Sequence, residues 1–266
     1  MNLSNKQIRA KARYLLDENI FGKDWLKSVF MMLVLVIADS IVGYLLAALV
    51  SAVVIVPLMQ LVGLVDSYIL TILAVVIPYL LVTLVLMGVS GVLSAGLASV
   101  HLDLVRGDGH LRIKKFFESF NSFVDNFLLG FMYLLNVALW SCLFIIPGIY
   151  VSFSYALIFH VKKDHPEYRW QQCFDESERL MEGNRWRLFK LYISFIGWEL
   201  LGALAFFGLG SLWVTPYINT SVAVFYEEAK NSKNSNVVSF DTKAKSDVDP
   251  VVVDLHSKGF SLHREK

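Results

Sequence analysis

Long parts of this 266-residue chain contain no lysine or arginine. All 24 basic residues lie in four segments, 1–27, 106–115, 162–190 and 230–266, so that 28–105, 116–161 and 191–229 have none. Basic side chains are costly in membrane hydrocarbon, and their absence over such lengths indicates membrane-embedded segments. The composition agrees, because 56% of the residues are hydrophobic and only 18% are charged, against about 25% in soluble proteins. An ordinary soluble fold is therefore excluded.

The chain also lacks the features of several function classes. A net charge of +1 gives no general attraction to nucleic acid, so we expect no nucleic-acid partner. No phosphate-binding glycine loop, HExxH motif or supported Ser/His/Asp arrangement is present, and His160, His165 and Cys173 do not have the spacing of zinc ligands. We therefore expect no enzyme, no cofactor and no metal site. Cys142 and Cys173 fall at different predicted depths, which argues against a disulfide.

The basic segments also predict the topology, because cytoplasmic loops of membrane proteins carry an excess of lysine and arginine. Each basic-free gap then holds an even number of spans, with both termini in the cytoplasm. The predicted spans are 29–56, 68–100, 124–145, 149–164, 188–207 and 211–228. Pro57, Gln60, Gly63 and Asp66 mark the predicted outer turn after the first span, and Gly208-Leu209-Gly210 the one after the fifth. The fold class is all-α, a polytopic transmembrane helical bundle of about six spans as three hairpins. Ile146-Pro147-Gly148 is predicted to be a turn, with a kink in one long helix as the alternative.

Three segments outside the spans have amphipathic helical spacing: 5–20, 106–123 and 162–190. In the first of them, the apolar positions Ile8, Ala12, Leu15, Leu16 and Ile20 share one face and lysine and arginine occupy the rest. Such helices lie on an anionic inner leaflet, so we expect the lipid bilayer itself to be a partner. The domain organisation is a basic amphipathic segment at 1–27, a transmembrane domain at 28–229 and a disordered cytoplasmic tail at 230–266.

Two stretches predict how the spans pack and where they meet the membrane surface. The small-residue run GVSGVLSAGLAS, from Gly88 to Ser99, predicts close approach of a second helix. Farther along, Gly183 suits the end of one helix and Asn184 the N-cap of the next. The side chains expected to anchor the following span at the headgroup level are Arg185, Trp186, Arg187 and Trp198.

Two acidic residues fall inside predicted spans and are the candidate functional residues. Asp39 lies near the middle of the first span, where a carboxylate costs about 2.5–3.5 kcal/mol on insertion scales. It could bind a cation, relay a proton or pair with a cation of a partner subunit. Alternatively, it faces the bundle in a protonated or hydrogen-bonded form. Glu199 lies in the inner third of the fifth span and could instead reach toward the inner surface. Asp103 and Arg106 have the spacing of an i,i+3 ion pair.

Several motifs together resemble a bacterial integral membrane family known as domain of unknown function 975. The residues that carry the resemblance are Ile146-Pro147-Gly148-Ile149, Ser154-Tyr155, Ser177, Arg179 to Phe189, Ser194 to Trp198, Pro216-Tyr217 and Phe225-Tyr226. Arg9, Ala12, Arg13, Leu16 and Arg106-Gly107 also fit the family. The resemblance covers about 1–229, and this chain has Arg185 where the family favours lysine. It implies a multi-pass protein of the bacterial plasma membrane. It brings no activity and no catalytic residue.

Two functions from different classes remain. The first is a non-enzymatic membrane component, such as a scaffold, an accessory subunit or a stress or immunity protein, with a protein partner or a second copy of the chain. The second is a small-molecule or ion transporter or channel that uses Asp39 and Glu199. Its helix breakers at membrane depth would be Pro57, Pro78, Pro147 and Pro216. A membrane-embedded enzyme acting on lipid is the weakest alternative.

Overall fold

The computed structural model describes residues 3–16, 22–62, 68–107, 111–204 and 210–257, without the side chains of 38, 61, 62 and 236–257. The predicted turn residues Gly63, Asp66, Gly208 and Leu209 lie outside these ranges. The elements are α1 Asn5–Leu15, α2 Lys23–Val50, the π-helix η1 Ser51–Ile55, α3 Val56–Val62, α4 Tyr68–Arg106, α5 Ile113–Glu118, the 3₁₀-helix η2 Ser119–Ser122, α6 Phe123–Leu143, α7 Ile145–Ser154, α8 Ile158–Asp164, α9 Trp170–Met181, α10 Arg185–Leu204 and α11 Ser211–Ser257. Every regular element among the described residues is helical, which confirms the all-α class.

Within the part of the chain that the structure describes, four segments are long and apolar enough to cross a membrane: Lys23–Gln60, Tyr68–Arg106, Ile113–Leu143 and Ile145–Asp164. The first combines α2, η1 and part of α3. The sequence predicted an outer turn beginning at Pro57, and this is wrong, because the helix continues through Pro57. Proline cannot donate a main-chain hydrogen bond, and the π-helix directly before it accommodates the interruption without ending the helix.

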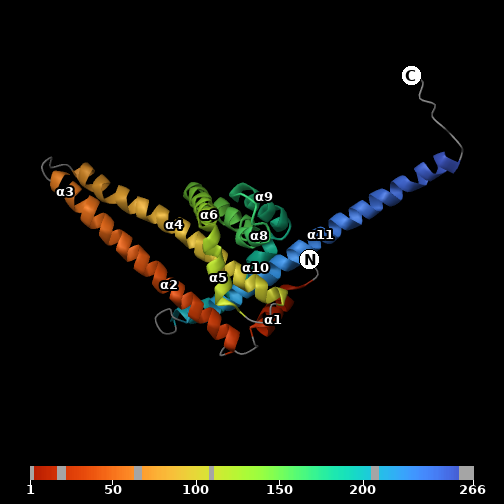
Figure 1. Ribbon diagram of the computed structural model, residues 1–266, viewed down its shortest axis with the longest axis horizontal. Coiled ribbons are helices and arrows are strands. Elements are labelled where there is room, and N and C mark those ends of the chain that lie inside the picture. The colour runs from red at the N-terminus through yellow and green to blue at the C-terminus, as the bar shows by residue number, and fades with distance from the viewer. Residues whose placement is uncertain (1–2, 17–21, 63–67, 108–110, 205–209, 258–266) are drawn as a thin grey trace, which may run out of the picture.

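Helix α4 runs back beside α2, and α6 packs on the second half of α4 (Figure 1). Glycines allow the contact between α4 and α6. A Cβ added to Gly91 would lie 2.4 Å from the Gly130 Cα, and one added to Gly88 would lie 2.2 Å from the ring of Phe127. The prediction that the small-residue run packs against another helix is confirmed.

The chain reverses at Phe144, whose backbone is extended between α6 and α7. A Cβ added to Gly148 would meet Ser141 Oγ at 2.1 Å, so α7 lies directly against α6. The break therefore comes before the predicted 146–148, and Pro147 lies in the first turn of α7, where a missing N–H costs little. The predicted span 149–164 is itself divided, because α7 ends at Ser154 and α8 begins at Ile158.

Helix α1 packs on protein at the end of the bundle where the basic residues gather. The side chains of Ile8, Ala12 and Leu16 are fully buried in the main apolar core. The contacts of α1 are with α11, α10 and α4. The expectation that this apolar face lies on lipid is therefore wrong, because the face is already buried against other helices of the bundle.

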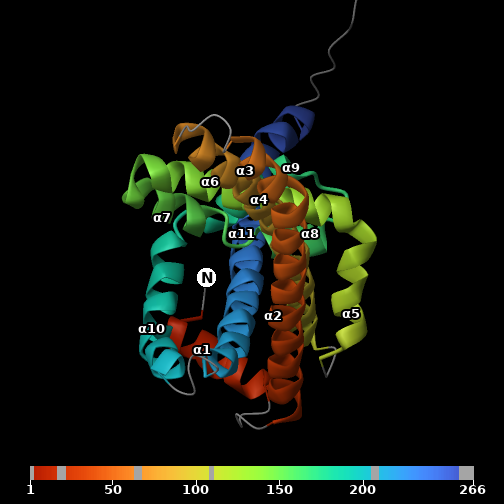
Figure 2. The same ribbon diagram turned by 90° about the vertical axis from the view of Figure 1, so that its left-hand side faces the viewer.

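Helix α11 lies between α10 and α2 and contacts both, with α1 crossing near one end (Figure 2). It then continues as helix to Ser257 and projects away from the other helices (Figure 1). The sequence predicted a disordered tail at 230–266, and up to Ser257 the structure differs. No glycine or proline interrupts the chain between Pro216 and Pro250, so nothing in the covalent structure stops the helix that packing begins.

Candidate functional site

Asp39 lines a cavity between α2, α4 and α11. The cavity has a volume of about 280 Å³, and its polar lining adds the hydroxyls of Ser90, Ser94 and Thr215. Ser90 Oγ donates to the Met87 carbonyl at 2.8 Å, and Thr215 Oγ1 donates to the Ser211 carbonyl at 2.8 Å. Because the Ser90 and Thr215 hydroxyls donate their protons to main-chain carbonyls, their oxygens can act only as acceptors toward the cavity.

The Asp39 carboxylate is poorly satisfied in this position. One of its oxygens is buried and makes no hydrogen bond within the described residues. A buried, unsatisfied carboxylate oxygen is costly unless a proton, a water molecule or a cation meets it. The cavity can therefore hold a small hydrated cation or water beside Asp39.

Glu199 does not share this cavity. It is half-buried on α10, whereas the cavity walls come from α2, α4 and α11. The two acidic residues that the sequence singled out are therefore separate features. Only Asp39 has oxygen-bearing neighbours arranged around a common space.

A second cavity lies against the same stretch of α4. It has a volume of about 190 Å³, and it shares Ser94 and Leu97 with the Asp39 cavity. Its polar lining includes His160, Tyr192 and Asn219. His160 is buried, and neither ring nitrogen has a hydrogen-bond partner among the described residues. Sequence spacing gave no signal for this histidine, because its surroundings come from α4, α8, α10 and α11.

Asp164 is the centre of an ion-pair network at the basic end of the bundle. It accepts hydrogen bonds from Arg106 Nη2 at 2.8 Å, from the Tyr226 hydroxyl at 2.7 Å and from the Lys230 ammonium. Arg106 Nε also donates to Glu227 Oε1 at 2.6 Å. The Asp164 side chain is only 5% exposed, so the network joins the ends of α4 and α8 to the middle of α11 around a buried carboxylate.

The predicted i,i+3 pair between Asp103 and Arg106 does not form in this network. Asp103 instead pairs with Lys115 at 2.7 Å and with Lys163 at 3.4 Å. Arg106 finds its partners on α8 and α11. Spacing along one helix allows a local pair, but more distant partners offer Arg106 two carboxylates, one of which is buried.

The break between α7 and α8 is closed by side chains from the next helices. Ser177 Oγ donates to the Ser154 carbonyl at 2.9 Å and accepts from the Leu157 amide at 3.3 Å. Arg185 Nε donates to Ser154 Oγ at 2.8 Å, and its guanidinium lies 4.6 Å from the Tyr150 ring centroid. Residues that carried the family resemblance thus satisfy main-chain groups that a helix break leaves open.

The helix junction after α9 follows the prediction only in part. Gly183 has φ +76° and supplies the left-handed residue that ends α9, as predicted. The Asn184 carbonyl accepts from the Arg187 and Leu188 amides, so Asn184 directly precedes α10. Its side chain donates backward to the Leu180 carbonyl at 2.9 Å, which satisfies the end of α9 rather than the start of α10.

The four predicted anchors divide into two pairs. Trp186 and Trp198 are 62% and 56% exposed, as side chains that face lipid would be. Arg185 bonds to Ser154 and to Glu178, and Arg187 donates to the Leu3 carbonyl before α1. The two arginines therefore connect protein segments in addition to lying at the basic end of the bundle.

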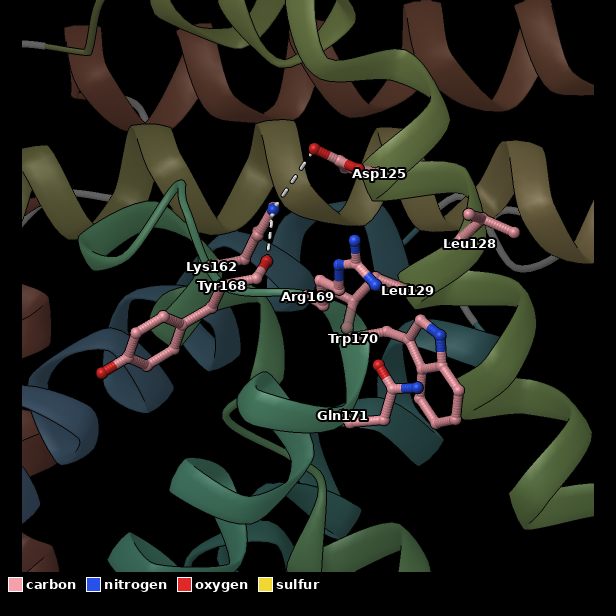
Figure 3. Close-up of a pocket in the computed structure, with 8 residues that line it drawn as sticks. All are labelled: Asp125, Leu128, Leu129, Lys162, Tyr168, Arg169, Trp170 and Gln171. Carbon is pink, nitrogen blue, oxygen red and sulfur yellow. Dashed lines mark hydrogen bonds and ion pairs between the residues drawn. The ribbon is translucent and has the colours of Figure 1, made fainter.

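A further cavity lies at the same end, between the start of α6, the end of α8 and the start of α9 (Figure 3). Its volume is about 310 Å³, and its lining residues are Asp125, Leu128, Leu129, Lys162, Tyr168, Arg169, Trp170 and Gln171. The Lys162 ammonium points toward Asp125 at 3.6 Å (Figure 3). The sequence gave no signal for this cavity beyond the basic character of 162–190.

Both cysteines are free, and their surroundings differ. Cys142 is exposed on α6, whereas Cys173 is fully buried on α9. Burial raises the pKa of the Cys173 thiol to about 11, because the thiolate would lose its hydration. Cys173 therefore stays a thiol at neutral pH. No group of three or more His, Cys, Asp or Glu side chains suited to a metal ion occurs in the described parts of the chain.

Comparison with known proteins identifies the segment that contains most of these features. No curated protein and no solved structure matches the chain. A family described as a protein of unknown function (DUF975) matches residues 143–233, from the α6–α7 turn into α11. This range includes Ser154, Asp164, Ser177 and Arg185, and it is narrower than the predicted 1–229. Residues 143–233 are therefore similar to the DUF975 family of unknown function, which confirms the resemblance over that segment.

Proposed function

We propose that the chain is a multi-pass protein of the bacterial plasma membrane with six spans as three hairpins and both termini in the cytoplasm. The spans would be α2 with α3, α4, α6, α7 with α8, α10 and the first part of α11. The four long apolar segments support this topology. So does the Asp164 network, in which the basic ends of α4 and α8 meet Lys230, just after the first part of α11.

Within this membrane setting, we propose that the protein is a non-enzymatic component, a scaffold or accessory subunit, that holds a protein partner or a second copy at its cytoplasmic face. The observation that carries the proposal is the network around Asp164. It ties α11 to α4 and α8 just before α11 leaves the bundle as a long helix. A rigidly fixed, projecting helix is a means of presenting a surface to a partner rather than a means of enclosing a substrate.

Cross-linking in native membranes tests this function. The full chain is compared with a chain truncated after Ser235, which keeps Lys230 and its bond to Asp164. We expect one or a few discrete cross-linked species with the full chain and their loss on truncation. An unchanged melting temperature of the truncated protein shows that the bundle is intact. Only uncross-linked monomer from the full chain would refute the scaffold function.

The cavity around Asp39 favours transport as a second function. The cavity supplies a carboxylate oxygen that has no partner among the described residues, together with three hydroxyls, and His160 lines the adjoining cavity. Such groups are suited to passing a proton or a small cation. Flux in proteoliposomes tests it. Asp39→Asn should abolish flux, and Glu199→Gln, outside the cavity, should leave it unchanged. The absence of flux for protons, metal cations and amphiphiles in the wild-type protein would exclude this function.

A further inference from the structure

The cavity of Figure 3 is lined by two cationic side chains, Lys162 and Arg169, which differ in how the protein holds them. Lys162 is held in place, since its ammonium donates to the Pro166 carbonyl at 2.8 Å and to the Tyr168 carbonyl at 2.7 Å. Its contact with Asp125 is longer, at 3.6 Å, and the Asp125 side chain is 62% exposed. The third N–H direction of Lys162 is therefore only loosely occupied by an exposed carboxylate.

Arg169 contributes donors that the protein does not use. It is exposed at the start of α9, and its guanidinium makes no hydrogen bond or ion pair with any residue that the structure describes. An arginine side chain has five N–H donors in a planar fork that fits phosphate oxygens. Lys162 and Arg169 together outweigh the single charge of Asp125, so the cavity is complementary to an anion.

The apolar part of the lining distinguishes a lipid from a free ion. Asp125 lies in the first turn of α6, and Leu128 lies one turn farther along, about 5 Å deeper. Leu128 is 38% exposed on the outer surface of α6. Trp170 lines the cavity as well, and tryptophan is enriched where headgroups meet acyl chains. The polar groups thus occupy headgroup depth, and the leucine occupies the depth where acyl chains begin.

We propose that this cavity binds the phosphate of an anionic phospholipid from the inner leaflet, with Arg169 and Lys162 on the phosphate and Leu128 and Trp170 against the upper acyl chain. Asp125 competes with the phosphate for Lys162. The inference depends on neither the scaffold nor the transport function, and it rests on the proposed membrane topology. It makes a particular cavity, rather than the general basic surface, the place where anionic lipid is recognised.

Native mass spectrometry of the purified full chain, titrated with defined lipids, tests the proposal. Phosphatidylglycerol should bind more tightly than phosphatidylcholine. Arg169→Gln should weaken phosphatidylglycerol binding about tenfold, since a charge-assisted hydrogen bond is lost. Asp125→Asn should strengthen it, because the competing carboxylate is gone. Lys190→Gln is the matched control: Lys190 is an exposed cation beside a tryptophan, 5.5 Å from the Trp186 ring, but lines none of the described cavities.

Three outcomes would overturn the proposal. Equal affinity for phosphatidylglycerol and phosphatidylcholine would show that the cavity does not select an anion. Equal losses in Arg169→Gln and Lys190→Gln would assign binding to the general basic surface. Binding of glycerol phosphate or inorganic phosphate as tightly as the whole lipid would assign the cavity to a soluble anion. Arg169 and Asp125 are exposed, so both variants should fold, and their melting temperatures verify this.

Discussion

Gly91→Ala should separate α4 from α6. The new Cβ would lie 2.4 Å from the Gly130 Cα and 2.8 Å from the Asn126 carbonyl oxygen, where ordinary contacts begin at 3.4 Å. The helices must therefore move apart by about 1 Å, and such a gap removes a quarter to a half of the dispersion energy of each facing contact. Both clashing groups are main-chain atoms and cannot rotate away, so we expect the upper end of the overpacking range, about 3 kcal/mol.

The matched control is Gly197→Ala on α10, where an added Cβ meets no atom within 4 Å. Both variants gain the same helix propensity, about 1 kcal/mol, so their difference isolates the clash. The apparent melting temperature in one detergent, at one heating rate, should be about 6–12 °C lower for Gly91→Ala than for Gly197→Ala. Equal melting temperatures would refute the close packing of α4 on α6.

Three further predictions concern the DUF975 segment. Ser177→Ala leaves a main-chain amide in the α7–α8 break without an acceptor and should lower the free energy of unfolding by about 1–3 kcal/mol, whereas Ser152→Ala, which only loses a bond to its own helix, should be nearly neutral. Asp164→Ala removes the buried carboxylate that pairs with Arg106 and Lys230, both about one third exposed, and should cost about 1–3 kcal/mol; a wild-type melting temperature would contradict the network. In a Cys142→Ala protein, maleimide at pH 7.5 should modify Cys173 only after denaturation. Because burial raises the Cys173 pKa from 9 to about 11, the stability that this thiol contributes is present below pH 9 and lost as the pH rises through 11.

Helix existence and type could be predicted well from the sequence, but helix ends could not. Apolar composition and helical spacing located the main helices up to residue 229, and the small-residue run indicated a close contact. Pro57 and Ile146-Pro147-Gly148 were assigned as turns because proline ends helices on average. In the structure a π-helix accommodates Pro57, and the chain reverses at Phe144. Both outcomes depend on how neighbouring helices pack.

In the candidate site, too, the sequence indicated some of the residues and only the structure revealed the others. Asp39 stood out because a carboxylate in a long apolar run is costly wherever the rest of the chain lies. Glu199 stood out for the same reason, yet it does not line the Asp39 cavity. His160, Lys162 and Arg169 gave no such signal, because their significance depends on side chains brought in from other helices.

The sequence by itself determined which segments are apolar enough for a membrane and where the basic ends lie, because both are properties of composition along one dimension. Only the tertiary structure decided what each polar group meets. Arg106 could have paired with Asp103 three residues away, and instead it bonds to Asp164 and Glu227. Coulomb energy and desolvation depend on distance and burial in three dimensions, so local spacing shows which pairs can form, and packing selects those that do.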